Sequence, residues 1–231
     1  PLLRAICSLG VSPFLNQMAM FLVQITLNNT LTYYGALSHY GEDIPLACVG
    51  VISKVNILML GFTLGISQGC QPIFSYNYGA RQYSRVREAY RKAIVAASII
   101  CCIAFVCFQL FPRPIVALFD PSGSEEYFQF AERYFRIYMF MTLANAFQPI
   151  TANFFTSIGK AKRGALIALT RQVIFLIPLI LIFPLFLGID GVMYAGPIAD
   201  SAAVVVALAL VTREMKRMPH VDEPVAADTL V

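Results

Sequence analysis

Six long apolar segments, separated by short polar turns, take up most of the 231 residues of this chain. They run over residues 11–35, 45–76, 93–111, 134–158, 164–187 and 191–212. The hydrocarbon core of a bilayer needs about 20 apolar residues in a helix, which each segment supplies. Charged residues make up only 13% of the chain, about half the share in soluble domains, so a water-compatible surface cannot cover it. The sequence therefore predicts an all-α polytopic membrane protein with six transmembrane helices.

The basic residues divide unequally between the two sides of these six spans. An even number of spans puts both chain ends on one side, and that side also holds the turns at 80–92 and 159–163. The positive-inside rule then places both ends in the cytoplasm. We expect residues 1–217 to form one six-helix lobe and residues 218–231 to form a polar cytoplasmic tail. The basic side carries Arg4, Arg81, Arg85, Arg87, Arg91, Lys92, Lys160, Lys162, Arg163, Arg213, Lys216 and Arg217, whereas the other side carries Arg113, Arg133 and Arg136.

Amide side chains recur on one stripe of the first span, at Gln17, Gln24 and Asn28. Positions 7 and 11 apart fall on the same face of a helix. An unpaired amide in hydrocarbon costs several kcal/mol, so the stripe should face other helices or a wet cavity. Two interpretations stay open: hydrogen bonds that hold the lobe together, or the lining of a substrate cavity. The fourth span offers similar amides beside Pro149, at Asn145, Gln148 and Asn153.

Three charged residues lie deep inside the predicted spans, more than five residues from either end. Lys54 and Asp200 each lie roughly 13 Å below the outer surface, at 1.5 Å of rise per residue. A charge at this depth needs a partner, so we expect Lys54 and Asp200 to approach each other. Arg171 is the rival partner, or its side chain extends to the cytoplasmic interface. Such a pair is either structural, or Asp200 exchanges its partner for a proton, a sodium ion or a cationic substrate.

The second span ends in a polar string, QGCQPIFSYNYGA, over residues 68–80. Pro72 is expected to interrupt the helix there, with Gln68, Gln71 and Asn77 satisfying the freed backbone groups. An Arg-rich cytoplasmic loop over 80–92 and a fresh apolar helix follow.

This string, with the loop and helix after it, resembles the multidrug and toxic compound extrusion (MATE) family. Supporting strings are SPFLNQMAMFLVQITLNN in the first span, TSIGKAKRGALIALTRQVIFLIPLILIFP across the fourth and fifth, and GVMYAGPIADSAA in the sixth. The resemblance implies two pseudo-symmetric six-helix lobes, of which this chain matches the C-terminal one. Because it starts at Pro1, we expect a piece of a longer protein; the alternative is a half-size protein that dimerises.

The resemblance also implies a function. It indicates a secondary-active antiporter of the plasma membrane that exports cationic or amphiphilic drugs in exchange for protons or sodium, by alternating access. Its expected partners are the lipid bilayer, small organic cations and an N-terminal six-helix lobe. Some branches of the family carry coupling carboxylates in the first and fourth spans of this lobe, but those spans have none here. We therefore expect the ion site to lie largely in the N-terminal lobe.

Other function classes fit the sequence less well. The basic residues sit in short runs between apolar segments, which argues against nucleic-acid binding. An enzyme or metal site needs clustered His and carboxylates, but the only two histidines fall in an outer loop and in the tail. We expect no enzyme activity, no metal and no cofactor. The alternative function is a flippase of the same superfamily for lipid-linked oligosaccharides or peptidoglycan precursors.

Overall fold

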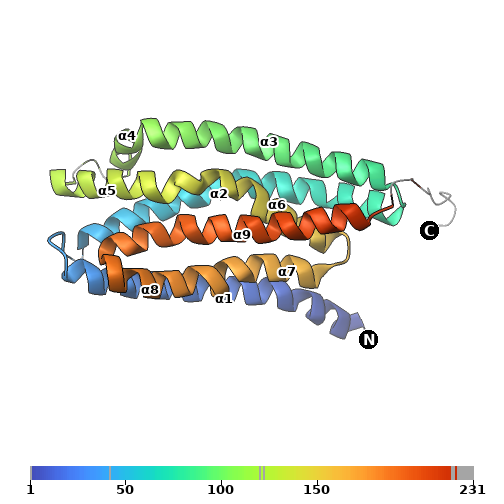
Figure 1. Cartoon of the computed structure of the whole chain (residues 1–231), viewed down its shortest axis with the longest axis horizontal. Helices are drawn as coiled ribbons and strands as arrows, with labels where there is room; N and C mark the ends of the chain where they lie inside the picture. Colours follow the sequence, from blue (N-terminus) through green and yellow to red (C-terminus); the bar gives the residue numbers. More distant parts are fainter. Residues whose placement is uncertain (1, 42, 120, 122, 220–221, 223–231) are drawn as a thin grey trace.

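Helices dominate the computed structural model, which describes residues 2–41, 43–119, 121, 123–219 and 222 (Figure 1). The side chains of residues 2–13, 15 and 145 lie outside this description. Within the described ranges the chain forms helices and no strand. In chain order the elements are α1 (Leu2–Ala36), α2 (Asp43–Gly79), α3 (Tyr83–Leu110), α4 (Pro112–Ala117), α5 (Glu125–Tyr138), the 3₁₀ segment η1 (Met139–Leu143), α6 (Ala144–Ser157), α7 (Ala161–Leu169), the π-helical segment η2 (Thr170–Leu176), α8 (Ile177–Leu187) and α9 (Ile189–Arg217).

Four helical runs in the described part of the chain are long and apolar enough to cross a membrane. They are Asp43–Gly79, Tyr83–Leu110, Ala161–Leu187 and Ile189–Arg217. The span predicted over 11–35 falls inside α1. The span predicted over 134–158 is not one regular helix, because η1 separates α5 from α6 and Met141 leaves helical geometry. Inside η1 the Thr142 hydroxyl donates to the carbonyl of Met139, which supplies a partner within the irregular turn.

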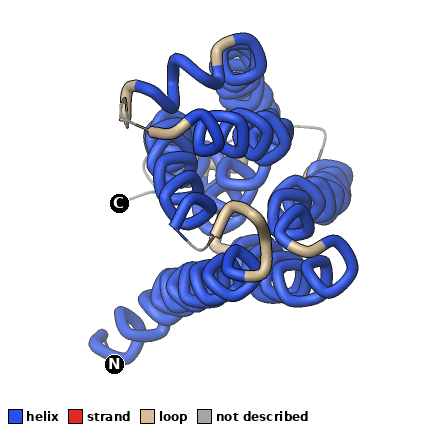
Figure 2. The backbone as a smooth tube through the Cα atoms, turned by 90° about the vertical axis from the view of Figure 1, so that its left-hand side faces the viewer, coloured by secondary structure: helices blue, strands red, loops and turns tan. Residues whose placement is uncertain are grey.

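The long helices run along one common axis, so the start of α1 and the end of α9 lie at the same end of the molecule (Figure 1). The view along this axis shows the helices end-on as a bundle, with the first turns of α1 projecting away from it (Figure 2). α2 packs against α1, α3, α5 and α6, and α9 packs against α5, α6, η2 and α8. These two helices therefore tie the bundle together.

The polar end of α2 differs from the prediction in two ways. α2 continues through Pro72 to Gly79, so the expected interruption at Pro72 is wrong. A proline removes one hydrogen bond from a helix, here the bond to the carbonyl of Gln68, without having to end it. The Asn77 side chain donates instead to the carbonyl of Ile73, at 2.8 Å. The basic stretch 80–92 is also not a loop, because α3 begins at Tyr83.

Aromatic side chains of α2, α5 and α6 form much of the core. Phe74, Phe130, Phe135, Phe154 and Phe155 are fully buried. Along α5, Phe130, Tyr134 and Tyr138 stack at successive turns, with ring centroids 6.0 and 5.7 Å apart. Rings four residues apart share one helix face. The last ring of the stack, Tyr138, lies against Gly196 of α9, where a Cβ would be 2.5 Å from its Cε2.

Glycines shape the hairpin between α8 and α9. Gly188 has φ of 59°, a backbone conformation that favours glycine, and it ends α8. Gly191 lies so close to the Phe183 backbone that a Cβ would be 2.5 Å from its carbonyl carbon. The tight turn folds α9 back along α8 and η2, which places the middle of α9 against η2.

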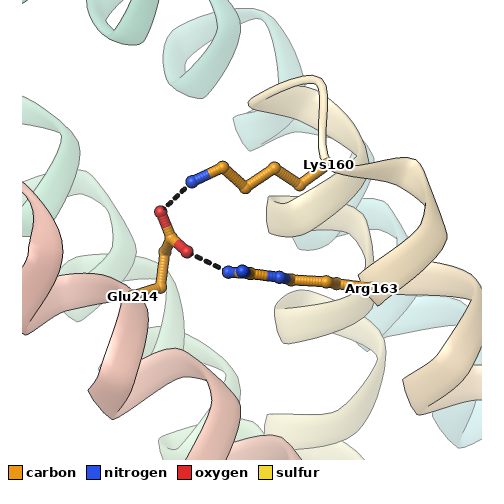
Figure 3. Close-up of polar contacts among 3 residues, drawn as sticks. All are labelled: Lys160, Arg163 and Glu214. Carbon is orange, nitrogen blue, oxygen red and sulfur yellow. Dashed lines mark hydrogen bonds and ion pairs between the residues drawn. The ribbon is translucent and has the colours of Figure 1, made fainter.

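Glu214 of α9 is buried, with 2% of its side chain exposed, and it accepts hydrogen bonds from two cations. Lys160, in the turn before α7, donates to one carboxylate oxygen, and Arg163 of α7 donates to the other (Figure 3). About a third of each cation's side chain remains exposed. This three-residue cluster fastens α7 to the last turns of α9.

The start of the tail docks on α3. The Arg87 guanidinium donates to the carbonyls of Met218 and Pro219, both at 2.8 Å. Hydrogen bonds from the hydroxyl and backbone N–H of Ser84 lower the pKa of Asp222. The remainder of the predicted tail over 218–231 lies outside the described residues.

The Glu214 cluster predicts unequal effects of removing its members. Replacing both cations (Lys160→Met with Arg163→Met) leaves a buried, unpaired carboxylate, and breaking a pair in this way costs up to about 3–5 kcal/mol. Glu214→Gln costs less, because the two partly exposed cations regain water. Thermal unfolding of the purified full-length protein in detergent measures both. The pair of Glu88 and Lys92 is the control, and Glu88→Gln should leave stability almost unchanged, because both side chains are largely in water. Equal losses of thermal stability in all three variants would contradict the conclusion that Glu214 is a buried carboxylate that depends on its two cations.

The contact between Gly196 and Tyr138 predicts a reciprocal rescue. Gly196→Ala should destabilise the protein by about 1–3 kcal/mol, because the new methyl group overlaps the tyrosine ring. Adding Tyr138→Leu should recover most of this loss. Gly65→Ala in α2 is the matched control, since no atom lies within 4 Å of its Cβ position. Thermal unfolding in detergent measures the stability of each variant. A Gly196→Ala variant as stable as Gly65→Ala would refute close packing between Gly196 and Tyr138.

Candidate substrate and ion site

A buried ion pair joins η2 to the middle of α9. Arg171 Nε donates to Asp200 Oδ1 at 2.5 Å, with 13% and 11% of the two side chains exposed. Two charges so far from water are tolerated only when each supplies the other's partner. The pair is thus the principal ionisable feature inside the lobe.

The structure corrects the predicted partner of Asp200. Lys54 lies on an exposed face of α2, whereas Asp200 is buried on the side of α9 that faces η2, so the two do not pair. Counted from the turn at Gly188, Arg171 is 17 residues away and Asp200 is 12 residues away. The difference is about 7–8 Å along the helix axis, which a long arginine side chain can bridge. Arg171, the rival partner in the sequence analysis, takes the place expected of Lys54.

The π-helical segment η2 carries both Arg171 and Gln172. Single π turns inside α-helices occur often at functional sites, because the extra residue changes which side chains face inward. Here Gln172 is 7% exposed, and Thr170 is also buried. Thr170 donates its hydroxyl to the carbonyl of Leu166, at 2.5 Å. A polar sequence thereby points into the lobe from an otherwise apolar span.

A cavity of about 120 Å³ lies beside the pair. Of the two ion-pair partners, Arg171 lines this cavity, and among the lining residues that the structure describes it alone is charged. Tyr138, the last ring of the α5 stack, closes one side against Gly196. The lining residues are Met20, Val23, Gln24, Leu27, Ser53, Asn56, Ile57, Leu60, Tyr138, Arg171, Gln172, Leu176, Ile180, Val192 and Gly196.

The predicted amide stripe of the first span faces out of this chain. Gln17, Gln24 and Asn28 are all exposed on α1. Gln24 also reaches the cavity, and its Nε2 donates to Asn28 Oδ1 at 3.1 Å. On the neighbouring α2, Lys54 and Gln68 are exposed as well. Between them Gly61 and Gly65 have no atom within 4 Å of a Cβ position. The adjoining sides of α1 and α2 therefore present these polar groups and glycines among exposed apolar side chains such as Phe21 and Leu58, a surface called here the open face.

The amides of the fourth span are not brought to the cavity. Asn153 donates to Ser67 Oγ at 2.7 Å, and Ser67 donates to the carbonyl of Pro149 at 3.3 Å, so this group ties α6 to α2. Gln148 is half-buried and is not among the described residues that line the cavity. The side chain of Asn145 lies outside the described part of the chain.

Three residues with amide or carboxylate side chains contribute to these sites but are absent from the predicted set. Gln172 lies in the polar run of residues 170–172, which interrupts an apolar segment and could have indicated it. Asn56 lies two positions after Lys54 and lines the cavity. Glu214 falls beyond the predicted end of the sixth span, yet it follows Ala207 and Val211 along the buried side of α9. Helical spacing alone could have found Glu214.

Comparison with known proteins agrees with this architecture. The MatE family model matches residues 17–182. Multidrug export protein MepA of Staphylococcus aureus (strain bovine RF122 / ET3-1) is 23% identical over 212 residues, covering 91% of this chain and 44% of MepA. MepA of Staphylococcus haemolyticus (strain JCSC1435) is 22% identical over the same length. The chain thus spans about half the length of the curated relatives it matches.

Solved structures match in the same way. The MATE multidrug transporter DinF-BH is 31% identical, with a TM-score of 0.78, covering 92% of this chain and 46% of that one. An inward-facing MATE family transporter of the MOP superfamily superposes with a TM-score of 0.83 at 20% identity, covering 94% of this chain and 48% of its own. With the family model matching most of its length, the chain belongs to the MatE family, and its fold is that of one lobe of a MATE transporter.

Proposed function

We propose that this chain is the C-terminal lobe of a secondary-active antiporter that exports cationic or amphiphilic drugs in exchange for protons or sodium. The observation that carries the proposal is the buried pair of Arg171 and Asp200 beside a cavity, within a lobe of the MatE family. Ionisable residues are rare inside membrane helices, and they mark substrate paths, ion paths and proton relays. The relatives named multidrug export protein support drugs as the cargo.

The open face supports pairing with a second, N-terminal lobe. Its amides, together with Lys54, are exposed in this chain, and exposure of such groups to lipid costs several kcal/mol each. A second lobe facing α1 and α2 across a wet cleft would supply them with water and partners. This arrangement matches the coverage of about half of each relative. Rocking of the two lobes about the cleft would then open it to one side of the membrane at a time.

Asp200 is the ionisable group that such a cycle would use in this lobe. In the structure its carboxylate is held by Arg171. When Asp200 takes a proton, a sodium ion or a cationic group instead, Arg171 is released and the packing between η2 and α9 changes. Differential contacts of this kind are what allow an ion to bias one conformation over another. Further coupling groups belong in the N-terminal lobe.

The membrane orientation follows from the distribution of basic residues. We infer a multi-pass protein of the plasma membrane, with the beginning of α1 and the end of α9 on the cytoplasmic side. The Glu214 cluster and the Arg87 contacts then lie at the cytoplasmic surface, and the ion pairs of Arg113 with Glu125 and of Arg133 with Asp190 lie at the outer one.

One observation favours the flippase as a second candidate. Arg171 lines the cavity, and a flippase for lipid-linked sugars needs cationic groups to hold pyrophosphate. Growth of cells that express the full gene, in the presence of ethidium or a fluoroquinolone, separates the two. Resistance with unchanged cell-wall precursors supports export, whereas precursor accumulation on depletion without drug resistance supports the flippase.

A coupling role for Asp200 predicts that Asp200→Asn abolishes transport but leaves the amount of protein in the membrane unchanged. Ethidium efflux driven by a proton or sodium gradient should fall at least tenfold, because the carboxylate that exchanges partners is gone. Membrane abundance should stay near the wild-type level, because Arg171 lines the cavity and can be hydrated there, and an asparagine still accepts its hydrogen bond. Efflux from energised cells and immunoblots of membranes measure the two quantities.

Asp190→Asn is the matched control for that experiment. It removes a carboxylate from the same helix, but from an exposed ion pair with Arg133, so efflux should remain close to normal. A purely structural role for Asp200 would instead lower abundance in proportion to efflux, and unchanged efflux in Asp200→Asn would reject coupling through this residue.

A further inference from the structure

We propose that the cavity beside Arg171 is a subsite for an oxyanion, a carboxylate or phosphate group carried by the exported molecule. This inference rests on the proposed transport function for its role, and on the donors around the cavity for its chemistry. It changes the expected cargo from a plain cation to an amphiphile with an anionic end.

Arg171 has unused hydrogen-bond donors at the cavity. A guanidinium carries five N–H groups in a planar fork, and the fork matches carboxylate and phosphate oxygens. Within the described residues only Nε has a partner, Asp200 Oδ1. The carboxylate thus engages one edge of the guanidinium, and the group itself lines the cavity while Asp200 does not. The remaining N–H groups are available to an acceptor that enters.

Gln172 adds a second donor without a partner. It is 7% exposed, lines the same cavity, and its side chain makes no hydrogen bond with any described residue. The amide borders the cavity and is not fully enclosed, so a ligand oxygen that enters can accept its hydrogen bond. Because η2 is a π-helix, Gln172 and Arg171 reach the cavity from adjacent positions. The two residues together can hold one oxyanion.

The charge around the cavity selects against a cationic group. Among the described lining residues the single charge is that of Arg171, and no carboxylate lines the wall. Asp200 offsets part of this charge from outside the cavity, but a positively charged amine inside it would still meet the guanidinium first and be repelled. While Arg171 and Asp200 stay paired, the cationic part of a substrate therefore lies outside this cavity, toward the open face of α1 and α2.

The size of the cavity fits an end group and not a whole drug. Its volume is about 120 Å³. Drug-sized ligands occupy roughly 300–1,000 Å³, and one water molecule takes about 30 Å³. The cavity thus holds a carboxylate or phosphate with one or two waters. Gln24, which lines the cavity and is exposed on α1, marks the side from which the rest of the molecule would approach.

The test uses ligands that differ only in the anionic group. Norfloxacin and its methyl ester share one ring system, but only the acid presents a carboxylate. Equilibrium dialysis with the purified full-length transporter in detergent gives the dissociation constant of each. We expect the acid to bind about tenfold more tightly than the ester, the ratio that one charge-assisted hydrogen bond supplies. Decyl phosphate and decanol form a second pair, in which the oxyanion is that of a lipid-like phosphate.

Three variants then assign the preference to its donors. Arg171→Gln with Asp200→Asn removes both charges without leaving either one buried alone, and should bring the acid-to-ester ratio close to one. Asp200→Asn alone keeps the guanidinium and removes the competing negative charge, so the preference for the acid should persist or grow. Gln172→Leu should reduce it severalfold. Asp190→Asn, in the first turn of α9 and not among the described residues that line the cavity, should leave the ratio unchanged.

The outcomes separate this proposal from the proposed function. If the wild-type protein binds acid and ester equally in both ligand pairs, or if the doubly neutral variant keeps the preference, the oxyanion subsite is wrong even where cells export ethidium. If the preference depends on Arg171 but cells export neither ethidium nor norfloxacin, the subsite holds and the drug-export function is wrong. A preference confined to decyl phosphate identifies a lipid phosphate as the source of the oxyanion.

Discussion

The cost of keeping an ionised group away from water governs how this lobe is built. α9 carries two buried carboxylates, Asp200 at its middle and Glu214 near its end, and each needs a cation within reach. The preceding antiparallel run supplies both: Arg171 from η2 for the first, and Lys160 with Arg163 around the start of α7 for the second. The tight turn at the end of α8 sets the register of this hairpin, so one register brings both carboxylates to their cations. Packing of aromatic rings fills the space in the core, and the pairs join the faces of the two helices that this packing brings together.

The same constraint divides the surface of the lobe into two kinds. Where polar groups find partners inside the chain, as Asn153 does with Ser67, they bind helices to one another. Where they do not, as with Gln17 and Lys54, they collect on the open face of α1 and α2 and leave the apolar sides of the bundle to lipid. A lobe with one hydrated side and several lipid-facing apolar sides suits one half of a two-lobe transporter. This agrees with its match to about half of each related transporter.

Much of this could be predicted from the sequence, and the limits have physical causes. Segment length and hydrophobicity identify the helices, and the need of Asp200 for a cation is evident from its depth. Whether Lys54 or Arg171 supplies that cation cannot be predicted in this way. The answer depends on which faces of α2 and α9 are turned inward, and helix rotation follows from packing across the whole bundle. The π-helix is equally hidden, since one extra residue in a turn leaves no mark in composition. Glu214 escapes for a simpler reason: burial along α9 continues past the end of the apolar segment.

That extra residue also gives η2 a mechanical property. A π turn holds one residue more than the α-helical turn it replaces, so its hydrogen bonds can shift along the chain by one position without unfolding the helix. At 3.6 residues per turn, such a slip turns the side chains it passes by about 100°. The side chains of Arg171 and Gln172 would then point toward different neighbours, while α7 and α8 keep their positions. The π-helical geometry of the fifth span therefore places the residues that line the cavity on the part of the helix that such a one-residue shift would reorient.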